Sequence, residues 1–367
     1  MYIKKLIGKK CYLSPFDLNG VNKVIMNKFI LLLIIILFTI SCGTSPNITR
    51  YRSSSDMISY STRRQTNAKI TVGVLRDGEK NIKIYGKDGR ELPFKEHIYE
   101  IASITKSFTG AIFAQLVMNG KLCLYETIDK HLDLPAGMNY PTIKSLLTHT
   151  SGYEREYMFR LAHIRNWIFS NPRHGQTRKK ILRKLTSLNL ENETNKHLYS
   201  NFGYAVAGLI LENIHNKEFT EIMNRFLSND LGLKNTRISD GTGSFSRYRR
   251  WQNDNPYLAS VGLVSTISDL LLYAEMLIYN NPSFLNLKFT NYEIINEYLN
   301  YGLGWYIEPR NNRIFHDGWS LHNSYIFIDF NYKLAIVVLS NLDNNFRYNS
   351  VAIGNAIIRE IYKEMIE

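Results

Sequence analysis

The longest apolar run of the chain lies near its N-terminus and extends from Phe29 to Ile40, 12 residues that are almost all apolar. A membrane-spanning helix needs about 20 such residues, so this run has the length of a signal-peptide core instead. Lys28 supplies a positive start shortly after Met26. We therefore predict a signal peptide over residues 26–41 of an exported protein, periplasmic or at the cell surface. Residues 1–25 are interpreted as an upstream extension.

Cys42 follows the apolar run almost directly. A cysteine there resembles a bacterial lipoprotein signal, in which the thiol is lipidated and becomes the new N-terminus, although Thr39 stands where Leu is usual. We predict a membrane anchor through a lipid on Cys42; a cleaved signal without lipid and an uncleaved anchor stay open. Residues 42–67 are rich in Ser, Arg, Asn and Thr and have no apolar period, which predicts a flexible tether.

Periodic patterns of apolar residues begin at Lys69. Residues 70–75 and 82–85 predict two strands joined by a hairpin at Asp77-Gly78. Residues 103–119 have the pattern of a helix that Gly120 closes. Further helices are predicted over residues 199–214, 266–279 and 351–366, and further strands over residues 324–329 and 334–339.

The order of these elements indicates the fold class. Two strands come first, then many helices, then several strands and a last helix. Such a chain can close one sheet by pairing its N-terminal and C-terminal strands, with the central helices in a separate layer. We predict an α/β (α+β) domain over residues 68–367, in which a mixed, mainly antiparallel sheet is flanked by helices and joined by an all-helical region.

Composition and charge add little to this picture. Apolar residues make up 44% of the chain and charged residues 21%, as in ordinary globular proteins. The formal net charge is +13, and the most basic stretch, residues 178–184, is interpreted as the solvated face of a helix with Ile181 and Leu182 turned inward. We predict no nucleic-acid partner, metal or cofactor, because no matching motif or ligand spacing is present. Cys123 is interpreted as a buried free thiol.

Ser103-Ile104-Thr105-Lys106 is the only Ser-x-x-Lys in the chain. Positions three apart lie on one face of a helix, so the lysine amine can approach the serine hydroxyl. A serine becomes nucleophilic when a neighbouring base takes its proton, and lysine can serve if burial lowers its pKa. The alternative is an N-cap serine with a solvated lysine. The apolar helix around Lys106 favours the catalytic interpretation, since a buried lysine needs a partner.

Tyr199-Ser200-Asn201 opens the helix predicted over residues 199–214. Beside Lys106, Tyr199 would share or relay the serine proton. Asn201 would donate a hydrogen bond to a substrate carbonyl or hold Lys106. The alternative for this tripeptide is a core aromatic residue followed by a capping asparagine.

His316-Asp317-Gly318-Trp319 is the third group of candidate site residues. Gly318 would let a substrate backbone approach a strand edge. The backbone N–H groups of Ser103 and Trp319 are the predicted oxyanion hole, and each such donor is worth roughly 10²–10³ in rate. A lone histidine near a strand is more often structural, so His316 is assigned to the site only together with the other two groups.

These three groups together resemble the serine β-lactamase-like superfamily, nearest its class C β-lactamase, DD-peptidase and esterase branch. The resemblance covers about residues 68–365, and four further stretches match it: residues 99–102, 146–152, 263–266 and 301–305. It implies a β-lactamase/transpeptidase-like fold, with Ser103 as the nucleophile and Lys106 as its base partner. Tyr199 would be the general base or proton relay, Asn201 a substrate contact, and His316 the residue of the third motif.

The third motif departs from the family pattern. His316 stands where many members have Lys, as in many esterase-like members, and Asp317 replaces a Ser or Thr. Those Lys and Thr side chains help to hold the carboxylate of β-lactams, which an acid would repel. Asp317 would lose this effect if it pointed away or paired with Arg313.

We therefore expect a serine hydrolase that forms an acyl-enzyme at Ser103 and hydrolyses a small ester or amide. One alternative is a D-Ala-D-Ala carboxypeptidase or β-lactamase acting on peptidoglycan-like substrates or β-lactams. Another is a catalytically weak lipoprotein that binds peptidoglycan or another ligand. A third is a surface lipoprotein that adheres through its basic stretch.

Overall fold

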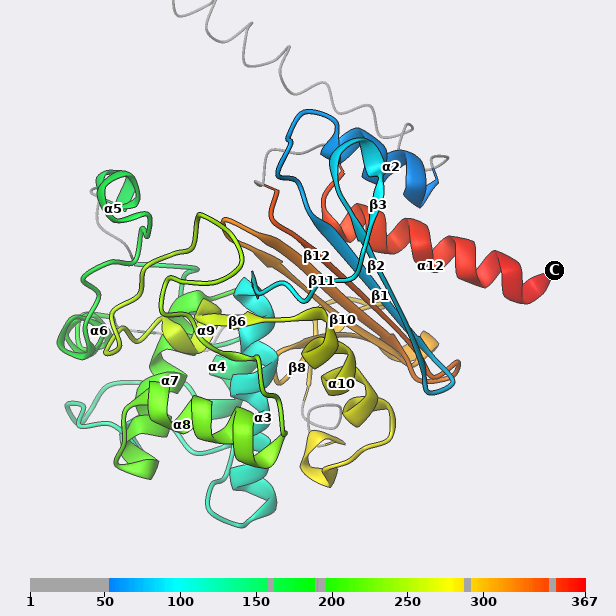
Figure 1. Cartoon of the computed structure of the whole chain (residues 1–367). Helices are drawn as coiled ribbons and strands as arrows, with labels where there is room; N and C mark the ends of the chain where they lie inside the picture. Colours follow the sequence, from blue (N-terminus) through cyan, green and yellow to red (C-terminus); the bar gives the residue numbers. More distant parts are fainter. Residues whose placement is uncertain (1–52, 158–161, 189, 191–195, 287–291, 343–347) are drawn as a thin grey trace, which may run out of the picture. The chain divides into compact units, whose positions relative to one another are not determined.

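The computed structural model of the protein describes residues 53–157, 162–188, 190, 196–286, 292–342 and 348–367 (Figure 1). The predicted upstream extension, signal peptide and lipidation site at Cys42 lie outside these ranges. Within them, no helix has the length and apolar character that crossing a membrane requires.

A nine-stranded sheet joins the two ends of the domain. Its order is β3-β2-β1-β12-β11-β10-β9-β8-β7, so the N-terminal hairpin lies beside the C-terminal strands, as predicted. Every pairing in it is antiparallel. In chain order the strands are β1 (Ile70–Arg76), β2 (Glu79–Tyr85), β3 (Glu91–Leu92), β7 (Glu293–Ile294), β8 (Asn300–Gly302), β9 (Trp305–Glu308), β10 (Arg313–Trp319), β11 (Asn323–Asp329) and β12 (Leu334–Ser340).

Strand β12 shows why the centre of the sheet is stable. All seven of its residues are buried, because helices cover both faces of the sheet (Figure 1). Alternate side chains enter different cores: Ile336 and Val338 pack with α2 (Ser54–Thr62) and α12 (Ser350–Ile366), and Val337 and Leu339 pack toward α10 (Ile267–Ile278).

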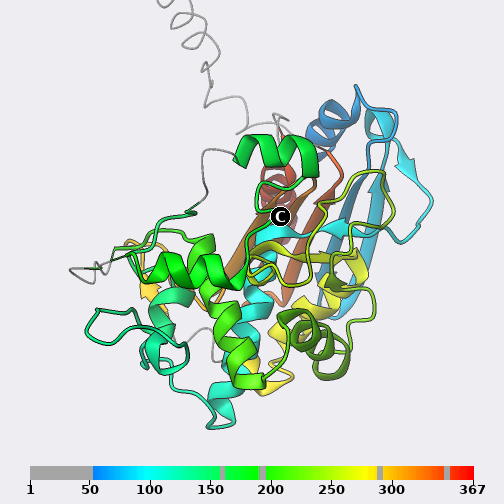
Figure 2. The same ribbon diagram turned by 90° about the vertical axis from the view of Figure 1, so that its left-hand side faces the viewer.

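The remaining helices form a layer in front of the sheet in the view of Figure 2. At its centre is α3, which packs on α9, while α7 packs on α4, α8 and α9. The helices of this layer are α3 (Thr105–Met118), α4 (Ile143–Leu147), α5 (Ala162–Phe169), α6 (Arg178–Leu185), α7 (Asn201–His215), α8 (Phe219–Arg225) and α9 (Leu258–Val261). A small sheet of order β4-β6-β5 borders it, with β4 (Tyr99–Glu100), β5 (Arg237–Ile238) and β6 (Leu263–Ser265). Short helical turns are η1 (Lys87–Gly89), η2 (Ala102–Ile104), η3 (Ile128–Lys130), η4 (Phe226–Asp230), η5 (Ser283–Asn286) and η6 (Pro309–Asn311).

The predicted tether over residues 42–67 is wrong for its second half. Residues 54–62 form α2, whose N-cap Ser53 accepts a hydrogen bond from the Asp56 N–H. Met57 and Ile58 are buried in the core shared with α12, and Ser54 bonds through its N–H and hydroxyl to the Glu360 carboxylate. The three apolar residues of α2 are too few to give a visible helical period, and one partner that stabilises it, Glu360, lies 306 positions away.

The predicted fold class and the predicted long elements are confirmed. The hairpin, the strands over 324–329 and 334–339, and the helices near 103–119, 199–214, 266–279 and 351–366 are all present, with small shifts at their ends. Cys123 is a correction, because it is exposed. Its neighbours Leu122 and Leu124 are buried, so the backbone turns the thiol outward between them.

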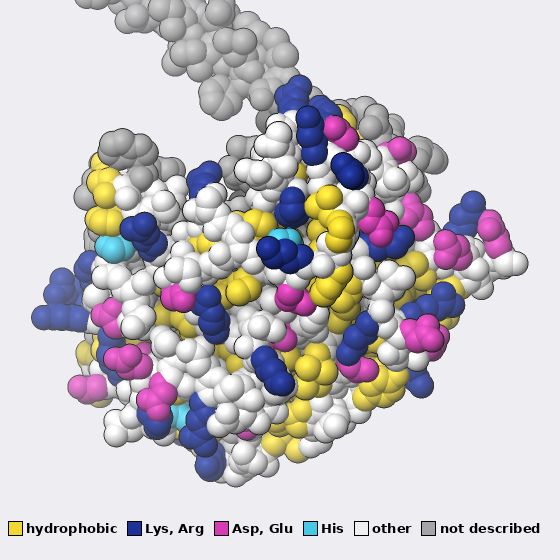
Figure 3. Space-filling view, in the orientation of Figure 1, with side chains coloured by type: hydrophobic (Ala, Val, Ile, Leu, Met, Phe, Trp, Pro, Cys, Tyr) yellow, Lys and Arg dark blue, Asp and Glu magenta, His cyan; other side chains and the backbone are white. Residues whose placement is uncertain are grey.

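The basic side chains do not form one continuous area on the face seen in Figure 3, where acidic and neutral side chains lie between them. The basic stretch predicted as a helix face is α6, with Ile181 and Leu185 as its buried residues. Leu182, predicted to turn inward, is partly buried and packs at the margin of the core.

Candidate active site

The chain enters the site through β4 and the short turn η2, which carries Ser103. Ala102, just before the serine, has a positive φ of 44°, a conformation that costs a non-glycine residue of order 1–3 kcal/mol. Strand β11 holds this segment in place, since the Ser324 hydroxyl donates to the Ile101 carbonyl at 3.0 Å. Ser103 therefore lies in a strained turn before α3, two residues ahead of the helix start at Thr105.

Lys106 is fully buried, at 0% exposure, which rules out the solvated lysine of the alternative interpretation. Its Nζ lies 3.3 Å from the Ser103 Oγ, 2.7 Å from the Asn201 Oδ1 and 3.0 Å from the Ser260 carbonyl oxygen. Burial, then the nearby Arg173 and Arg155, lower the Lys106 pKa well below its ordinary value. A neutral amine has two N–H donors and one lone pair. The amide and carbonyl oxygens accept the two donors, which leaves the lone pair for the serine hydroxyl.

Tyr199 also contacts the nucleophile. Its side chain is hydrogen-bonded to that of Ser103, and burial raises its pKa above the usual range, so the phenol keeps its proton at neutral pH. The Lys106 Nζ lies 4.8 Å from the centroid of the Tyr199 ring. Ser103, Lys106 and Tyr199 thus form one connected group. A phenol that keeps its proton fits the role of a proton relay better than that of a general base.

His149 positions this tyrosine. Its Nδ1 accepts the Ser200 N–H at 3.0 Å, its carbonyl accepts the Leu198 N–H at 2.7 Å, and its ring centroid lies 4.2 Å from that of Tyr199. Burial, with the nearby Lys106 adding to it, lowers the His149 pKa well below its usual value and favours the neutral ring that this hydrogen bond needs. The stretch over residues 146–152 therefore helps to position Tyr199 through the contacts of His149.

Asn201 is the first residue of α7, but it does not cap the helix. Ser200 is the N-cap, and its hydroxyl accepts the Gly203 N–H at 2.9 Å. The Asn201 side chain accepts from Lys106 through Oδ1 and donates through Nδ2 to the Glu156 Oε1 at 2.8 Å. Of the two roles expected for Asn201, this geometry favours holding Lys106.

The third motif divides between the two faces of β10. Asp317 and Trp319 line a cavity of about 320 Å³ together with Ser103, Tyr199 and Asn201. His316, from the alternate position, is buried behind them. Its Nε2 lies 3.2 Å from the Tyr301 hydroxyl and its Nδ1 lies 2.7 Å from the Asp317 carbonyl, and burial lowers its pKa to about 4. His316 is thus a neutral supporting residue here, and the expectation that it lines the substrate site is corrected.

Gly318 faces the same way as His316. A Cβ at Gly318 would lie 2.2 Å from the Ile101 carbonyl oxygen and 2.2 Å from the Ser324 Oγ. The missing side chain therefore lets the nucleophile turn approach β10, and the approach of a substrate backbone at Gly318 stays a prediction. The roles of the Ser103 and Trp319 backbone N–H groups as oxyanion donors stay a prediction.

The Asp317 side chain lines the cavity. Arg313, which was considered as its ion-pair partner, pairs with Asp329 instead, at 2.6 Å. The Asp317 carboxylate accepts a hydrogen bond from the indole N–H of Trp319, whose side chain is exposed. The condition under which the acid would repel a substrate carboxylate is therefore met.

Four other residues of this cavity were not predicted from the sequence: Arg155, Arg173, Val261 and Tyr306. Arg173 forms an ion pair with Glu156, the residue that also binds Asn201. The guanidinium carbon of Arg155 lies 5.2 Å from the centroid of the Tyr199 ring. The two arginines come from loops with no periodic pattern, Val261 ends α9 and Tyr306 lies in β9, so only the tertiary structure brings these residues beside Ser103.

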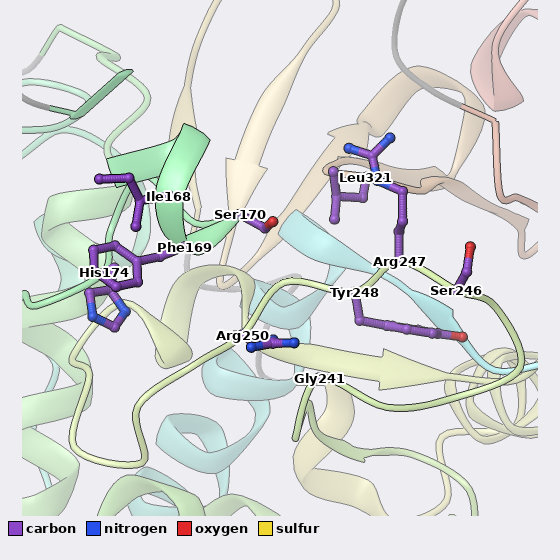
Figure 4. Close-up of a pocket in the computed structure, with 10 residues that line it drawn as sticks. All are labelled: Ile168, Phe169, Ser170, His174, Gly241, Ser246, Arg247, Tyr248, Arg250 and Leu321. Atoms are coloured by element: carbon purple, nitrogen blue, oxygen red, sulfur yellow. The ribbon is translucent and has the colours of Figure 1, made fainter. Parts of the chain in front are cut away.

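A larger cavity, of about 450 Å³, lies elsewhere (Figure 4). Apolar side chains of Ile168, Phe169 and Leu321 line it together with Arg247 and Arg250. None of its lining residues is a nucleophile with a neighbouring base, so we place the chemistry in the smaller cavity. Among the described residues, no group of three His, Cys, Asp or Glu side chains is arranged to hold a metal ion.

The turn between β8 and β9 packs against the catalytic helix through Gly304. Its φ is +89°, and a Cβ there would lie 2.3 Å from the Lys106 carbonyl oxygen. We expect Gly304→Ala to lower the free energy of unfolding by about 2–4 kcal/mol, through backbone strain and a clash with α3. Gly120→Ala is the matched control, because Gly120 has a φ of +65° and no atom within 4 Å of such a Cβ. Equal losses in denaturant unfolding of the two variants would contradict the close approach.

Comparisons with known proteins agree on one family. The model of the family described as Beta-lactamase matches residues 62–357. Protein flp of Staphylococcus aureus (strain MW2) is 25% identical over 281 residues, which cover 68% of this chain and 53% of that protein. A β-lactamase of Providencia stuartii is 24% identical over 223 residues, which cover 56% of this chain and 54% of that protein. The chain thus spans about half the length of the curated relatives it matches.

Solved structures with the same fold include three of different description. A penicillin-binding protein homologue from Pyrococcus abyssi has a TM-score of 0.68 at 21% identity, covering 82% of this chain and 74% of its own. A class C β-lactamase has a TM-score of 0.65 at 16% identity, with 84% and 96% covered. A D-stereospecific amidohydrolase from Streptomyces sp. has a TM-score of 0.63 at 16% identity, with 82% and 96% covered. At these identities the likeness shows the fold.

Proposed function

The chain belongs to the β-lactamase family, and we propose that it is a serine hydrolase that forms an acyl-enzyme at Ser103. The observation that carries this proposal is the fully buried Lys106, whose Nζ lies 3.3 Å from the Ser103 Oγ while two oxygens accept its protons. Burial lowers the pKa of Lys106, and a lysine with a lowered pKa beside a serine can act as the base for its hydroxyl.

The proposed reaction has two steps. In the first, the Ser103 proton passes to Lys106, Oγ attacks the acyl carbon, and the leaving group departs with a proton relayed through Tyr199. In the second, water attacks the acyl-enzyme, gives a proton back through the same residues, and releases the acid. The Ser103 and Trp319 backbone N–H groups are proposed to bind the oxyanion in both steps.

The negative charge of Asp317 favours a small ester or amide that has no carboxylate near the scissile bond. A D-Ala-D-Ala carboxypeptidase or β-lactamase is the second candidate, because family relatives carry the name β-lactamase. Both of those substrates present a carboxylate near the scissile bond, where Asp317 lies. A non-catalytic ligand-binding lipoprotein is a weaker alternative, since it has no use for a buried neutral lysine beside a serine. Export and a lipid on Cys42 remain part of this proposal.

A substrate panel tests the proposed function. It contains p-nitrophenyl esters, D-amino-acid amides, D-Ala-D-Ala peptides and a chromogenic cephalosporin. We expect turnover of neutral esters or amides to exceed that of the peptide and the cephalosporin. Efficient turnover of the cephalosporin alone would move the assignment to the second candidate.

Asp317→Thr is expected to reduce the discrimination against a carboxylate near the scissile bond. The charge faces the cavity and pairs with no arginine, so its removal should bring kcat/KM for matched neutral and anionic substrates closer by about 10- to 100-fold. The measurement is kcat/KM for both substrates in the wild type and the variant. An unchanged ratio would mean that Asp317 takes no part in selection, and β-lactam and peptidoglycan substrates would return to contention.

A further inference from the structure

Three charged side chains line the catalytic cavity: Asp317, Arg155 and Arg173. Asp317 supplies a negative charge from β10. Arg155 supplies a positive charge from the loop that follows α4. Asp317 and Arg155 do not form an ion pair with each other within 4.0 Å, so each charge is available to a bound molecule.

Arg155 differs from the other arginine of the cavity. Arg173 is paired with Glu156, which also accepts a hydrogen bond from Asn201. Within the described residues, the Arg155 guanidinium has no ion pair and no hydrogen bond, although it lines the cavity that contains Ser103. It is an exposed cation whose N–H groups are free to bind a ligand.

The position of Arg155 is nevertheless fixed. Its carbonyl accepts the N–H groups of Asn201 at 3.0 Å and Phe202 at 3.2 Å, which ties its backbone to the start of α7. Its guanidinium lies against the Tyr199 ring, 5.2 Å from the centroid. An arginine stacked on an aromatic face keeps the N–H groups at its edge free, and those groups match a carboxylate in two parallel hydrogen bonds.

From these observations we infer that Arg155 binds a carboxylate at the far end of the acyl group. Tyr199 contacts Arg155 with its ring and Ser103 with its side-chain hydrogen bond. A carboxylate bound to Arg155 would therefore be separated from the Ser103 Oγ by about the width of one aromatic ring. Asp317 disfavours a second carboxylate near the scissile bond. This inference rests on the proposed function and names its substrate class: half-esters or half-amides of dicarboxylic acids, with a neutral or cationic leaving group.

The test compares two substrates that differ by one methyl group. The mono-p-nitrophenyl esters of adipate and pimelate carry a free carboxylate, and their methyl esters do not. We expect the wild type to prefer the free carboxylate, and Arg155→Gln to reduce the ratio of kcat/KM between each acid and its methyl ester about 10- to 100-fold. The ratio within one variant cancels any effect of Arg155 on Lys106 and Tyr199 that both substrates share. Arg155→Lys should keep part of the preference, because it retains the charge but not the paired donors.

Arg250→Gln is the matched control, since it removes the same charge from an exposed arginine of the other cavity (Figure 4). It should leave the preference unchanged. A preference that survives in Arg155→Gln, or falls equally in Arg250→Gln, would overturn the assignment. Rising salt should weaken the wild-type preference, as for any partly exposed ion pair.

A binding measurement separates this inference from the proposed function. Trp319 lines the same cavity, so its fluorescence can follow the binding of monomethyl adipate and dimethyl adipate to the Ser103→Ala protein, which is expected not to hydrolyse them. Tighter binding of the monoester, lost in Arg155→Gln, supports the carboxylate subsite even if Ser103 fails to react with a fluorophosphonate. Equal binding of the two esters, in a protein that does react, overturns the subsite and leaves the hydrolase intact.

Discussion

Replacing Ser103 by alanine is expected to abolish turnover, with at least a thousandfold loss in kcat, while the fold stays intact. The serine hydroxyl is the group that both Lys106 and Tyr199 contact, so no other oxygen of the site is placed to take its part. Nucleophile deletions in serine hydrolases of other families cost up to about 10⁶ in kcat. The loss of the hydroxyl should cost about 1 kcal/mol of stability.

Ser107→Ala is the control for this experiment. Ser107 is buried at the start of α3, four residues after Ser103, and its hydroxyl donates to the Ile104 carbonyl at 2.9 Å. Its removal deletes a nearby buried hydroxyl without touching the proton path. Circular dichroism and thermal unfolding check the fold of both variants. If Ser103→Ala kept more than a few per cent of wild-type activity on a verified substrate, Ser103 would not be the nucleophile.

Lys106→Ala and Tyr199→Phe are each expected to lower the acylation rate by several orders of magnitude. Both side chains contact Ser103, and they lie close to each other, with the Lys106 Nζ 4.8 Å from the tyrosine ring. Residues that act as one unit show non-additive losses. The double variant should therefore be little slower than the slower single variant. Losses that multiply would indicate that the two residues do not share a proton path.

Tyr204→Phe is the matched control for the tyrosine. Its ring lies 5.4 Å from the Lys106 Nζ, but its hydroxyl donates to the Leu147 carbonyl at 2.8 Å. We expect it to keep most of the activity. A loss as large as that of Tyr199→Phe would point to the aromatic packing around Lys106 and away from the Tyr199 hydroxyl.

The pH dependence of acylation examines the same lysine. Because its pKa is lowered by burial, Lys106 is neutral above that lowered pKa and becomes protonated as the pH falls through it. Protonation removes the lone pair that accepts the serine proton, so the single-turnover rate should fall as the pH drops through the lowered pKa and be flat above it. A rate that instead rises steadily toward pH 10.5, the ordinary pKa of a lysine, would show that Lys106 is charged in the resting enzyme.

Local patterns were enough to predict the long elements and the proximity of Ser103 and Lys106. These two residues are three positions apart, across the junction of η2 and α3, and the strands around Asp77-Gly78 are neighbours in the chain. The buried environment of Lys106 follows from the apolar residues of α3 itself. Such features depend on contacts within a few residues, which is why the sequence pattern carries them.

Features made by distant segments were missed or misassigned. Arg155 and Arg173 reach the cavity from loops without periodicity, and α2 depends on Glu360 near the other end of the chain. The third motif shows a different limit. Alternation along β10 requires His316 and Asp317 to face opposite ways, but the four letters alone do not tell which one faces the cavity.

Intact-protein mass spectrometry with a covalent serine probe tests the nucleophilic reactivity of Ser103 most directly. The folded protein is treated with a fluorophosphonate, which forms a bond to a reactive serine oxygen as fluoride leaves, and the modified peptide is then sequenced. We predict one adduct per chain, located on Ser103, absent in Ser103→Ala and strongly slowed in Lys106→Ala. An adduct on another serine, or none in a protein shown to be folded, would contradict the assignment of Ser103 as an activated nucleophile.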